Sequence, residues 1–311
     1  MNINRILEIV LITYNRKPHL ERTLEQLFAD NSPVKNLNIT VLDNASTDGS
    51  SELLRKYTLK YSNLKHLRHK KNIGGNANIV RAFETASMPY VWVICDDDSY
   101  HWKGWPEIEK ALTEGNYDIL LTRKDDLKGT SNLAKIIRQL SFLPSGIYKT
   151  DILTSRVIIN MMANISNLFP HLVPACEVLN RKGSIFLPQE EVLDKTTFDI
   201  TPTEVLYTKD VGGHTFPAVK NMFWTVGFIN SIQFIEDKKL RNYVLENLGR
   251  HGFFGYIFAA FKKNYTVYKA SGLNWSFVWH GLSVKNKIEF LFATFLLRVI
   301  TLPQLVLKSK K

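Results

Sequence analysis

Residues 89–99 read PYVWVICDDDS, an apolar run that ends directly in three aspartates. Tyr90 to Cys95 is rich in β-branched and aromatic residues and too short for a helix, so it is predicted to be a buried strand. Asp96, Asp97 and Asp98 then lie at its exposed C-terminal end, where like charges repel one another unless a cation or a donor-rich ligand offsets them. A solvated acidic turn is the alternative for this triplet taken alone.

Strand and helix patterns alternate before this stretch. Apolar runs predict strands at Glu8 to Thr13, Leu37 to Leu42 and Leu64 to Arg68, and amphipathic segments separate them. Such alternation implies right-handed βαβ units, and therefore an α/β fold whose mostly parallel sheet is covered by helices. Ligands of such sheets bind beyond the C-terminal ends of the strands.

Four polar segments follow these predicted strands: Thr13 to Arg16, Asp43 to Ser50, Asn72 to Asn76, and the aspartates. Each has a structural explanation, because DGS is a common turn and GG a common helix entry. Their joint placement predicts one site, in which glycines let a phosphate or a base approach the backbone. The spacing fits neither GxGxxG nor a Walker lysine motif, which argues against an ordinary dinucleotide or P-loop site.

TYNR, DNASTDGS, NIGG and DDD, in this order, resemble the motifs of the GT-A glycosyltransferases of family 2 over about residues 7 to 125. The resemblance implies a GT-A Rossmann-like sheet, a nucleotide-diphosphate sugar donor, a divalent Mn²⁺ or Mg²⁺ ion, and transfer with inversion. It implies that Asp43 accepts a hydrogen bond from the base, that Asp96 lies near the ribose and that Asp98 binds the metal. The nucleotide-sugar-binding residues that it implies are Thr13, Tyr14, Arg16, Asp43, Asn44, Asp48, Asn72, Gly74, Gly75, Asp96 and Asp97.

Inversion needs a base that takes the proton of the acceptor hydroxyl. Many relatives carry a Glu-Asp pair at the start of an acceptor-side helix, but the matching residues 164–180 have none, and His171 occupies the helix start. His171 is therefore the predicted base, with a packing or capping role as the alternative. Its rivals are the carboxylates of Glu177, Glu190, Glu191 and Asp199.

Two later segments complete the predicted site. Residues 143–153 are expected to add a strand against the nucleotide-binding half and to frame the acceptor cleft. His214 lies in a glycine-flanked loop, VGGHTF. Because some family members complete the metal shell with a late histidine, His214 is a second predicted metal ligand, with a plain loop residue as the alternative.

The charge of the chain is uneven. Of a net charge of +11, residues 215–311 carry 14 basic and 4 acidic residues, a difference of +10. This shift predicts a GT-A nucleotide-sugar-binding and catalytic domain over residues 1–220, followed by a helical, basic C-terminal extension over residues 221–311.

The C-terminal extension contains two apolar segments, 253–261 and 290–297, that are bordered by lysines and arginines. This pattern predicts interfacial helices at an anionic membrane; packing on the sheet domain, or on a second copy in a homo-oligomer, is the alternative. No nucleic-acid-binding motif accompanies the basic charge. Two cysteines without metal or disulfide spacing, and no targeting signal, predict a cytoplasmic protein. The two bordered apolar segments add the prediction that it is peripheral on the inner face of the cytoplasmic membrane.

Together these features predict an inverting, metal-dependent glycosyltransferase that acts on a hydroxyl of a bacterial-type surface glycan or of a lipid-linked glycan precursor. Two other classes stay open. A metal-dependent nucleotidyltransferase would release pyrophosphate from a nucleoside triphosphate, and a non-catalytic subunit would bind the nucleotide sugar without turning it over.

Overall fold

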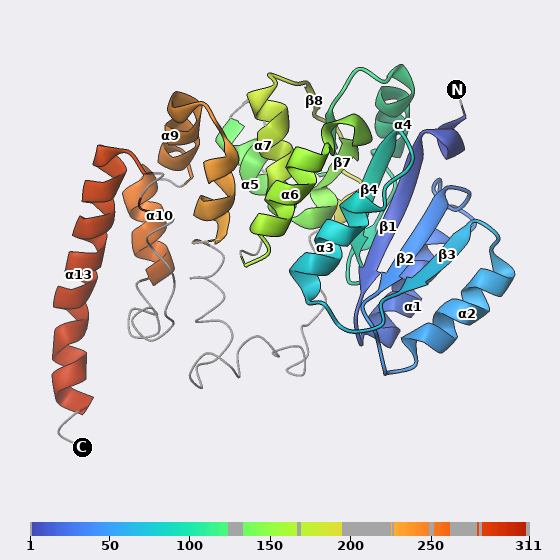
Figure 1. Ribbon diagram of the computed structural model, residues 1–311, viewed down its shortest axis with the longest axis horizontal. Coiled ribbons are helices and arrows are strands. Elements are labelled where there is room, and N and C mark those ends of the chain that lie inside the picture. The colour runs from blue at the N-terminus through green and yellow to red at the C-terminus, as the bar shows by residue number, and fades with distance from the viewer. Residues whose placement is uncertain are drawn as a thin grey trace. The chain divides into compact units, whose positions relative to one another are not determined.

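The computed structural model describes residues 2–123, 133–166, 169–194, 225, 227–248, 252–261, 279 and 282–308. The chain divides into two compact units (Figure 1). The first contains residues 1–132 and 136–199, and the second contains residues 133–135 and 200–311. The predicted boundary near residue 220 lies outside the described residues and stays a prediction.

The first unit is built on a twisted, mostly parallel sheet, as the sequence predicts (Figure 1). Its described strands run in the order β3-β2-β1-β4-β7-β6-β8, and β5 and β9 form a separate antiparallel pair. The strands are β1 (Leu7–Thr13), β2 (Asn38–Asp43), β3 (Leu64–Arg68), β4 (Tyr90–Cys95), β5 (Ser99–Tyr100), β6 (Ile119–Leu121), β7 (Gly146–Lys149), β8 (Ile185–Phe186) and β9 (Leu193–Asp194).

Helices cover both faces of this sheet. Ile9 of β1 belongs to an apolar cluster with Leu24 of α1, Leu54 of α2 and Ile108 of α4. Val10 points to the opposite face because side chains alternate along a strand, and α3 packs there on β1 and β4. The helices are α1 (Lys17–Leu27), α2 (Ser50–Lys60), α3 (Gly75–Glu84), α4 (Trp105–Glu114), α5 (Leu133–Leu140), α6 (Ser155–Ala163) and α7 (Leu172–Asn180), with short 3-10 turns at Ile3–Arg5, Leu143–Ser145 and Thr150–Ile152.

The register of the parallel strands brings their C-terminal ends to one edge. Thr13 at the end of β1 pairs with Asp43 at the end of β2, and Asp43 pairs with Arg68 at the end of β3. On the other side of β1, Ile12 pairs with Cys95 at the end of β4. The polar segments that follow these strands therefore start from neighbouring positions.

The predicted strand within residues 143–153 is present as β7. It lies between β4 and β6 and runs antiparallel to both. Trp92 of β4 anchors this part of the sheet, because its indole Nε1 donates a 2.8 Å hydrogen bond to the carbonyl oxygen of Pro144. The proposed role of this segment at an acceptor cleft stays a prediction.

The described part of the second unit is helical. Its elements are α9 (Lys238–Glu246), α10 (Gly252–Phe261) and α13 (Val284–Lys308), with a 3-10 turn at Ile232–Phe234. α10 packs against both α9 and α13, and Phe253, Ile257 and Leu297 are buried. In the part of the chain that the structure describes, no helix is long and apolar enough to cross a membrane.

Candidate active site

The first polar network joins the loop after β1 to the aspartates after β4. The Thr13 hydroxyl donates to Asp96 Oδ2 at 2.6 Å, and Arg16 Nη1 donates to Asp96 Oδ1 at 2.7 Å. Arg16 Nη2 also donates to Asp97 Oδ2 at 3.0 Å. One guanidinium thus balances two of the three carboxylates, which allows Asp96 to be buried.

Two side chains of α1 hold the backbone of the same loop. The Thr23 hydroxyl donates to the carbonyl oxygen of Asp96 at 3.0 Å, and Gln26 Nε2 donates to that of Asp98 at 3.2 Å. Gln26 Oε1 accepts from the Tyr100 amide at 3.1 Å. Sequence reasoning missed both residues, although a polar Thr23 among the buried leucines of an amphipathic helix is a usable signal, since a buried hydroxyl needs a partner.

Asp98 differs from its two neighbours. Its side chain is 2% exposed, and its Oδ2 is buried without a hydrogen-bond partner. Burial, followed by the negative charges of Asp97 and Asp96, raises the pKa of Asp98 well above its usual value. An anionic oxygen in this position costs free energy until a cation or a proton reaches it.

The surroundings of Asp98 fit a divalent cation. The Cys95 sulfur and one carboxylate oxygen each of Asp97 and Asp98 lie within 4.8 Å of one another. Carboxylate oxygens are hard ligands of the kind that Mn²⁺ and Mg²⁺ prefer. The thiol of Cys95 adds a softer donor that the sequence did not point to, because a lone cysteine in a strand usually packs as a small apolar residue.

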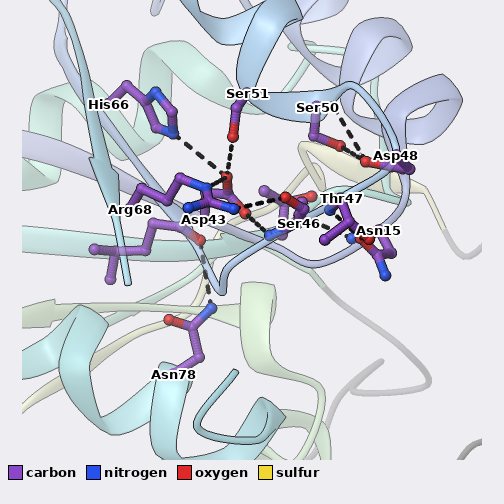
Figure 2. A network of polar contacts seen from close by, with 12 residues as sticks. Asn15, Asp43, Ser46, Thr47, Asp48, Ser50, Ser51, His66, Arg68 and Asn78 are labelled. Carbon is purple, nitrogen blue, oxygen red and sulfur yellow. Dashed lines mark hydrogen bonds and ion pairs between the residues drawn. The ribbon is translucent and has the colours of Figure 1, made fainter. Parts of the chain in front are cut away.

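The second network surrounds Asp43, whose side chain is 0% exposed (Figure 2). Asp43 Oδ1 accepts from the Ser46 amide at 2.8 Å, and Oδ2 accepts from the Ser51 hydroxyl at 2.7 Å. His66 Nε2 lies 3.5 Å and Arg68 Nε 3.3 Å from the same Oδ2. Burial pushes the pKa of Asp43 upward, but the hydrogen bonds from His66, Ser46 and Ser51 outweigh it and hold the pKa far below its usual value.

These contacts show that the carboxylate of Asp43 organises the loop that follows β2. Arg68 reinforces the loop from β3, because its Nη2 donates to the Ser46 carbonyl oxygen at 2.9 Å. Asn15 joins the loop from β1: its amide donates to the Ser46 hydroxyl at 2.9 Å, and its Oδ1 accepts from the Thr47 amide at 2.7 Å (Figure 2). The predicted contact between Asp43 and a nucleotide base stays a prediction.

Asn44 and Asn72 tie the loop after β2 to the loop before α3. Asn44 Nδ2 donates to Asn72 Oδ1 at 2.8 Å, and Asn44 Oδ1 accepts from the Ile73 amide at 2.9 Å. The Gly74 amide also donates to Asn72 Oδ1 at 2.8 Å. Gly74 has φ +87°, a conformation that side chains disfavour, which explains the glycine immediately before the first helical residue, Gly75.

Asp48 connects the first turns of two helices. Its Oδ2 accepts from the Lys17 amide of α1 at 2.8 Å, and its Oδ1 accepts from the hydroxyl and the amide of Ser50 of α2, at 2.6 and 3.1 Å. Burial alone would raise the pKa of Asp48, but these hydrogen bonds outweigh that effect, so the pKa lies below its usual value.

Tyr14, another predicted site residue, is half-buried just after β1.

The two networks meet at the end of β1. The Asn44 amide donates to the Thr13 carbonyl oxygen at 3.0 Å, while the Thr13 hydroxyl bonds Asp96. The structure therefore brings residues of all four predicted polar segments to one edge of the sheet. It also brings in side chains that the sequence did not single out: Asn15, Thr23, Gln26, Ser46, Ser51, His66 and Arg68.

His171 precedes α7 and is 3% exposed. Its Nε2 donates to the Ser141 carbonyl oxygen at 3.0 Å, and its ring meets the Phe169 ring edge-on at 5.8 Å. Burial lowers the pKa of His171 to about 4, against the opposing effect of the bond to Ser141. The ring is therefore neutral near pH 7, with the unprotonated Nδ1 buried and without a hydrogen-bond partner.

The rival carboxylates have different surroundings. Glu177 forms a 2.6 Å ion pair with Arg156, and Glu190 forms a 2.9 Å ion pair with Lys103. The segment that contains Glu190 and Glu191 lies beside the chain that follows β5, because the Gly104 amide donates to the Glu191 carbonyl oxygen at 3.2 Å. A Cβ at Gly104 would lie 2.0 Å from the Glu190 carbonyl oxygen, so only glycine fits there. Asp199, the remaining rival carboxylate, and His214, the second predicted metal ligand, lie outside the described residues.

Sequence comparisons place the first half of the chain among known proteins. The family described as Glycosyl transferase family 2 matches residues 8–166. The abequosyltransferase RfbV of Salmonella typhimurium is 28% identical over 95 residues, which are 30% of this chain and 28% of that protein. An uncharacterized glycosyltransferase of Mycoplasma pneumoniae is 24% identical over 101 residues, which are 32% of this chain and 34% of that protein. The chain thus matches about a third of the length of these relatives.

Solved structures resemble the chain over a greater length. TarS residues 1–349 of S. aureus in complex with UDP-GlcNAc has a TM-score of 0.54 and 14% identity, and the match covers 96% of this chain and 92% of that one. A mannosyltransferase of Pyrobaculum calidifontis in complex with GDP-Man and Mn²⁺ has a TM-score of 0.50 and 15% identity, with 95% and 80% covered. At these identities the likeness shows the shared α/β GT-A fold.

Proposed function

The chain belongs to glycosyl transferase family 2, and on that premise we propose that it transfers a sugar, with inversion, from a nucleotide-diphosphate sugar to a hydroxyl of a surface glycan or of its lipid-linked precursor. The observation that carries this proposal is the buried, unpartnered Asp98 Oδ2 in the loop just after β4. Such an oxygen, beside Asp97 and Cys95, suits the divalent cation that accompanies a diphosphate donor.

The proposed metal is Mn²⁺ or Mg²⁺. Asp98 would hold it, with Asp97 and Cys95 within reach and His214 as a further proposed ligand. When bound, such an ion stabilises the negative charge that develops on a departing diphosphate. The mannosyltransferase whose fold the chain shares was solved with GDP-Man and Mn²⁺, which supports this choice.

The proposed donor site uses the loops at the edge of the sheet. Thr13 and Arg16 hold the carboxylate of Asp96, which would lie near the ribose, and the Asn44–Asn72 pair shapes the loop against which the nucleotide would lie. The remaining residues proposed for this site are Tyr14, Asp43, Asp48, Gly74, Gly75 and Asp97. TarS, which shares the fold, was solved with UDP and with UDP-GlcNAc, and these complexes support a nucleoside diphosphate as the common part of the donor.

His171 stays the proposed base, and two observations bear on it. Its Nε2–H is fixed on a backbone carbonyl, so Nδ1 is the nitrogen able to accept a proton. Its deep burial and its pKa of about 4 instead suit a packing residue, because a base works best with a pKa near the working pH. Glu191 is the rival carboxylate that we compare with His171. Its backbone carbonyl oxygen accepts a hydrogen bond from the Gly104 amide, in the chain that follows β5.

A release assay tests the proposed reaction. The full chain is incubated with Mn²⁺ and a panel of nucleotide sugars, and nucleoside diphosphate is measured for each donor. We expect release with one donor class and little release in excess EDTA or with Asp98→Asn. Asp30→Asn serves as the control, because the Asp30 side chain is fully exposed in a 3.4 Å surface ion pair with Lys35.

The same assay separates the alternatives. Pyrophosphate released from a nucleoside triphosphate, with no release from nucleotide sugars, would identify a nucleotidyltransferase. Saturable binding of a nucleotide sugar without turnover on any acceptor extract would identify a non-catalytic subunit. Full activity in excess EDTA would remove the metal from the proposal.

A further inference from the structure

Helix α13 has two apolar faces, and only one is covered. Phe290, Ala293 and Leu297 are 6%, 0% and 0% exposed, and they lie on the side that packs on α10. The opposite side follows the spacing i, i+4, i+7, i+8 and i+11 from Val284, and it remains open to solvent. Its residues are Val284, Ile288, Leu291, Phe292 and Phe295, exposed by 73%, 62%, 55%, 54% and 60%.

This open face continues beyond those residues. Val299 follows the same spacing and is 49% exposed, so the apolar stripe extends over about 22 Å of helix. From α10, the Phe254 ring lies 5.8 Å from the Phe292 ring and 5.7 Å from the Phe258 ring. Two neighbouring helices therefore contribute to one aromatic and aliphatic surface, called here the α10–α13 face.

Basic residues border the face. Lys285 and Lys287 stand on opposite sides of the stripe by helical spacing, and Lys285 is 61% exposed while it forms a 3.0 Å ion pair with Glu246. Lys287 Nζ lies 5.4 Å from the centre of the Trp279 ring. Helix α13 contains four basic residues and only one acidic residue, and residues 215–311 carry a net charge of +10.

We propose that the α10–α13 face docks on an anionic lipid surface, with its apolar side chains in the headgroup boundary and the bordering lysines on the lipid headgroups. The charge selects this occupant. In a symmetric pair of chains both partners present a patch with the same excess of positive charge, which disfavours association. Anionic lipid offers both the apolar layer and the opposite charge.

Docking would serve the proposed function, on which this one consequence rests. An acceptor attached to lipid is confined to the membrane surface, and an enzyme held at that surface meets it without searching the surrounding volume. The docking itself requires neither donor nor acceptor, so it can be measured on the substrate-free chain.

Vesicle co-sedimentation of the full chain tests the proposal. Vesicles of phosphatidylglycerol and phosphatidylcholine are compared with vesicles of phosphatidylcholine alone, at low and high salt. We expect binding to the anionic vesicles at low salt and weaker binding at high salt. Ile288→Glu combined with Phe295→Glu should weaken the binding at least about tenfold, because two apolar anchors are lost and two like charges face the lipid.

A matched control variant replaces two exposed apolar residues by glutamate outside the α10–α13 face. Leu59 of α2 and Ile159 of α6 are 85% and 63% exposed in the first unit, and Leu59→Glu combined with Ile159→Glu should leave vesicle binding within about twofold. Replacing Lys285 and Lys287 by Gln should weaken binding to the anionic vesicles roughly fivefold per lysine, without a change on phosphatidylcholine alone.

Three outcomes would overturn the proposal. One is a full chain that stays in the supernatant with every vesicle at every salt concentration. Another is a dimer, detected by light scattering, that the Ile288→Glu and Phe295→Glu changes convert to monomer, since the face would then bind a second copy. The last is a lowered melting temperature in that variant with unchanged vesicle binding, since the face would then be internal. Nucleoside diphosphate release is scored separately, so failure of docking and failure of the proposed reaction are distinguishable.

Discussion

Asp43 ends β2 and Asp98 lies in the loop just after β4, the two strands that flank β1. Both residues are almost fully buried, yet they are opposite in character. The carboxylate of Asp43 has partners on both oxygens, and its pKa is lowered. Asp98 has an oxygen without a partner, and its pKa is raised. Burial alone therefore does not tell what an acidic residue does. The partners of its oxygens separate a residue that holds a loop together from one with an unpartnered oxygen, for which we propose a cation.

The sharpest test of this contrast is Asp98→Asn. If the residue holds the catalytic cation, kcat should fall by about two to three orders of magnitude, as for other groups that stabilise transition-state charge. The stability of the metal-free chain should not fall, because the change removes a buried charge that lacks a partner. Mn²⁺ should raise the melting temperature of the wild type but not of the variant.

Asp97→Asn is the matched control for that experiment, because Asp97 is less buried and is paired with Arg16. It should reduce kcat much less than Asp98→Asn does. An equal fall in kcat in the two variants would remove the distinction drawn between these neighbours. A marked fall in the stability of metal-free Asp98→Asn would also remove it.

Asp43→Asn should have the converse profile. It breaks a buried carboxylate cluster with His66 and Arg68, so the free energy of unfolding should fall by about 3 kcal/mol. Because folding lowers the pKa of Asp43, its contribution is complete above about pH 4 and is lost as the pH falls below that value. Urea unfolding between pH 3 and pH 7 measures this, and the loss in the variant should shrink toward the acid end.

The comparison extends to His171, a third buried group. Its pKa is lowered to about 4 in the folded chain, against about 6.5 when unfolded, so stability should rise with pH across this window and be complete above it. The wild type should lose about 2 kcal/mol between pH 7 and pH 5 from this group alone. His171→Gln should flatten that part of the profile.

Kinetics on the same His171→Gln variant decide its role. A base contributes roughly two to four orders of magnitude to kcat, with donor binding unchanged, whereas a packing residue leaves kcat nearly intact. A raised acceptor KM with a modest loss of kcat would assign His171 to acceptor positioning, and the same measurement on Glu191→Gln would then identify the rival.

The smallest expected effect concerns Cys95, whose sulfur lies with the oxygens of Asp97 and Asp98. A thiol favours softer metals than carboxylates do. Cys95→Ser should therefore weaken Cd²⁺ binding about tenfold, with little change for Mn²⁺, as measured by calorimetry. Equal affinities in wild type and variant for both metals would place the thiol outside the ligand shell.

Local patterns in the sequence were enough to predict where the first four strands of the sheet begin and end, to within one residue. The predicted strands at 64–68 and 90–95 match β3 and β4, and the other two differ from β1 and β2 by one residue at their ends. β1 and β4 are buried almost throughout, so their apolar runs are unbroken and their limits are marked by polar residues. β3 is the edge strand, and its residues after Leu64 are partly or fully exposed. The rule that ligands bind beyond the strand ends then placed the polar segments correctly at one edge.

The hydrogen-bond partners of those polar residues could not be predicted from local patterns in the sequence. Thr23 and Gln26 bond carbonyl groups 73 and 72 residues away, and His66 reaches Asp43 through the pairing of β2 with β3. Such contacts depend on register and helix rotation, which no local pattern records. The sequence therefore predicted that these aspartates lie at one edge of the sheet, but it did not show that both oxygens of Asp43 have partners while Asp98 Oδ2 has none.

Helix α1 connects the two acidic regions mechanically. Its first residue is held by Asp48 in the loop after β2, and its Thr23 and Gln26 hold the carbonyl groups of Asp96 and Asp98. A ligand that shifts α1 from either end displaces the other loop as well. Occupancy of the proposed metal site should thus change the affinity of the proposed nucleotide site, and thermodynamic reciprocity requires the nucleotide to change the affinity for the metal by the same factor. An arrangement of this kind favours cooperative assembly of donor and ion over independent loading of each.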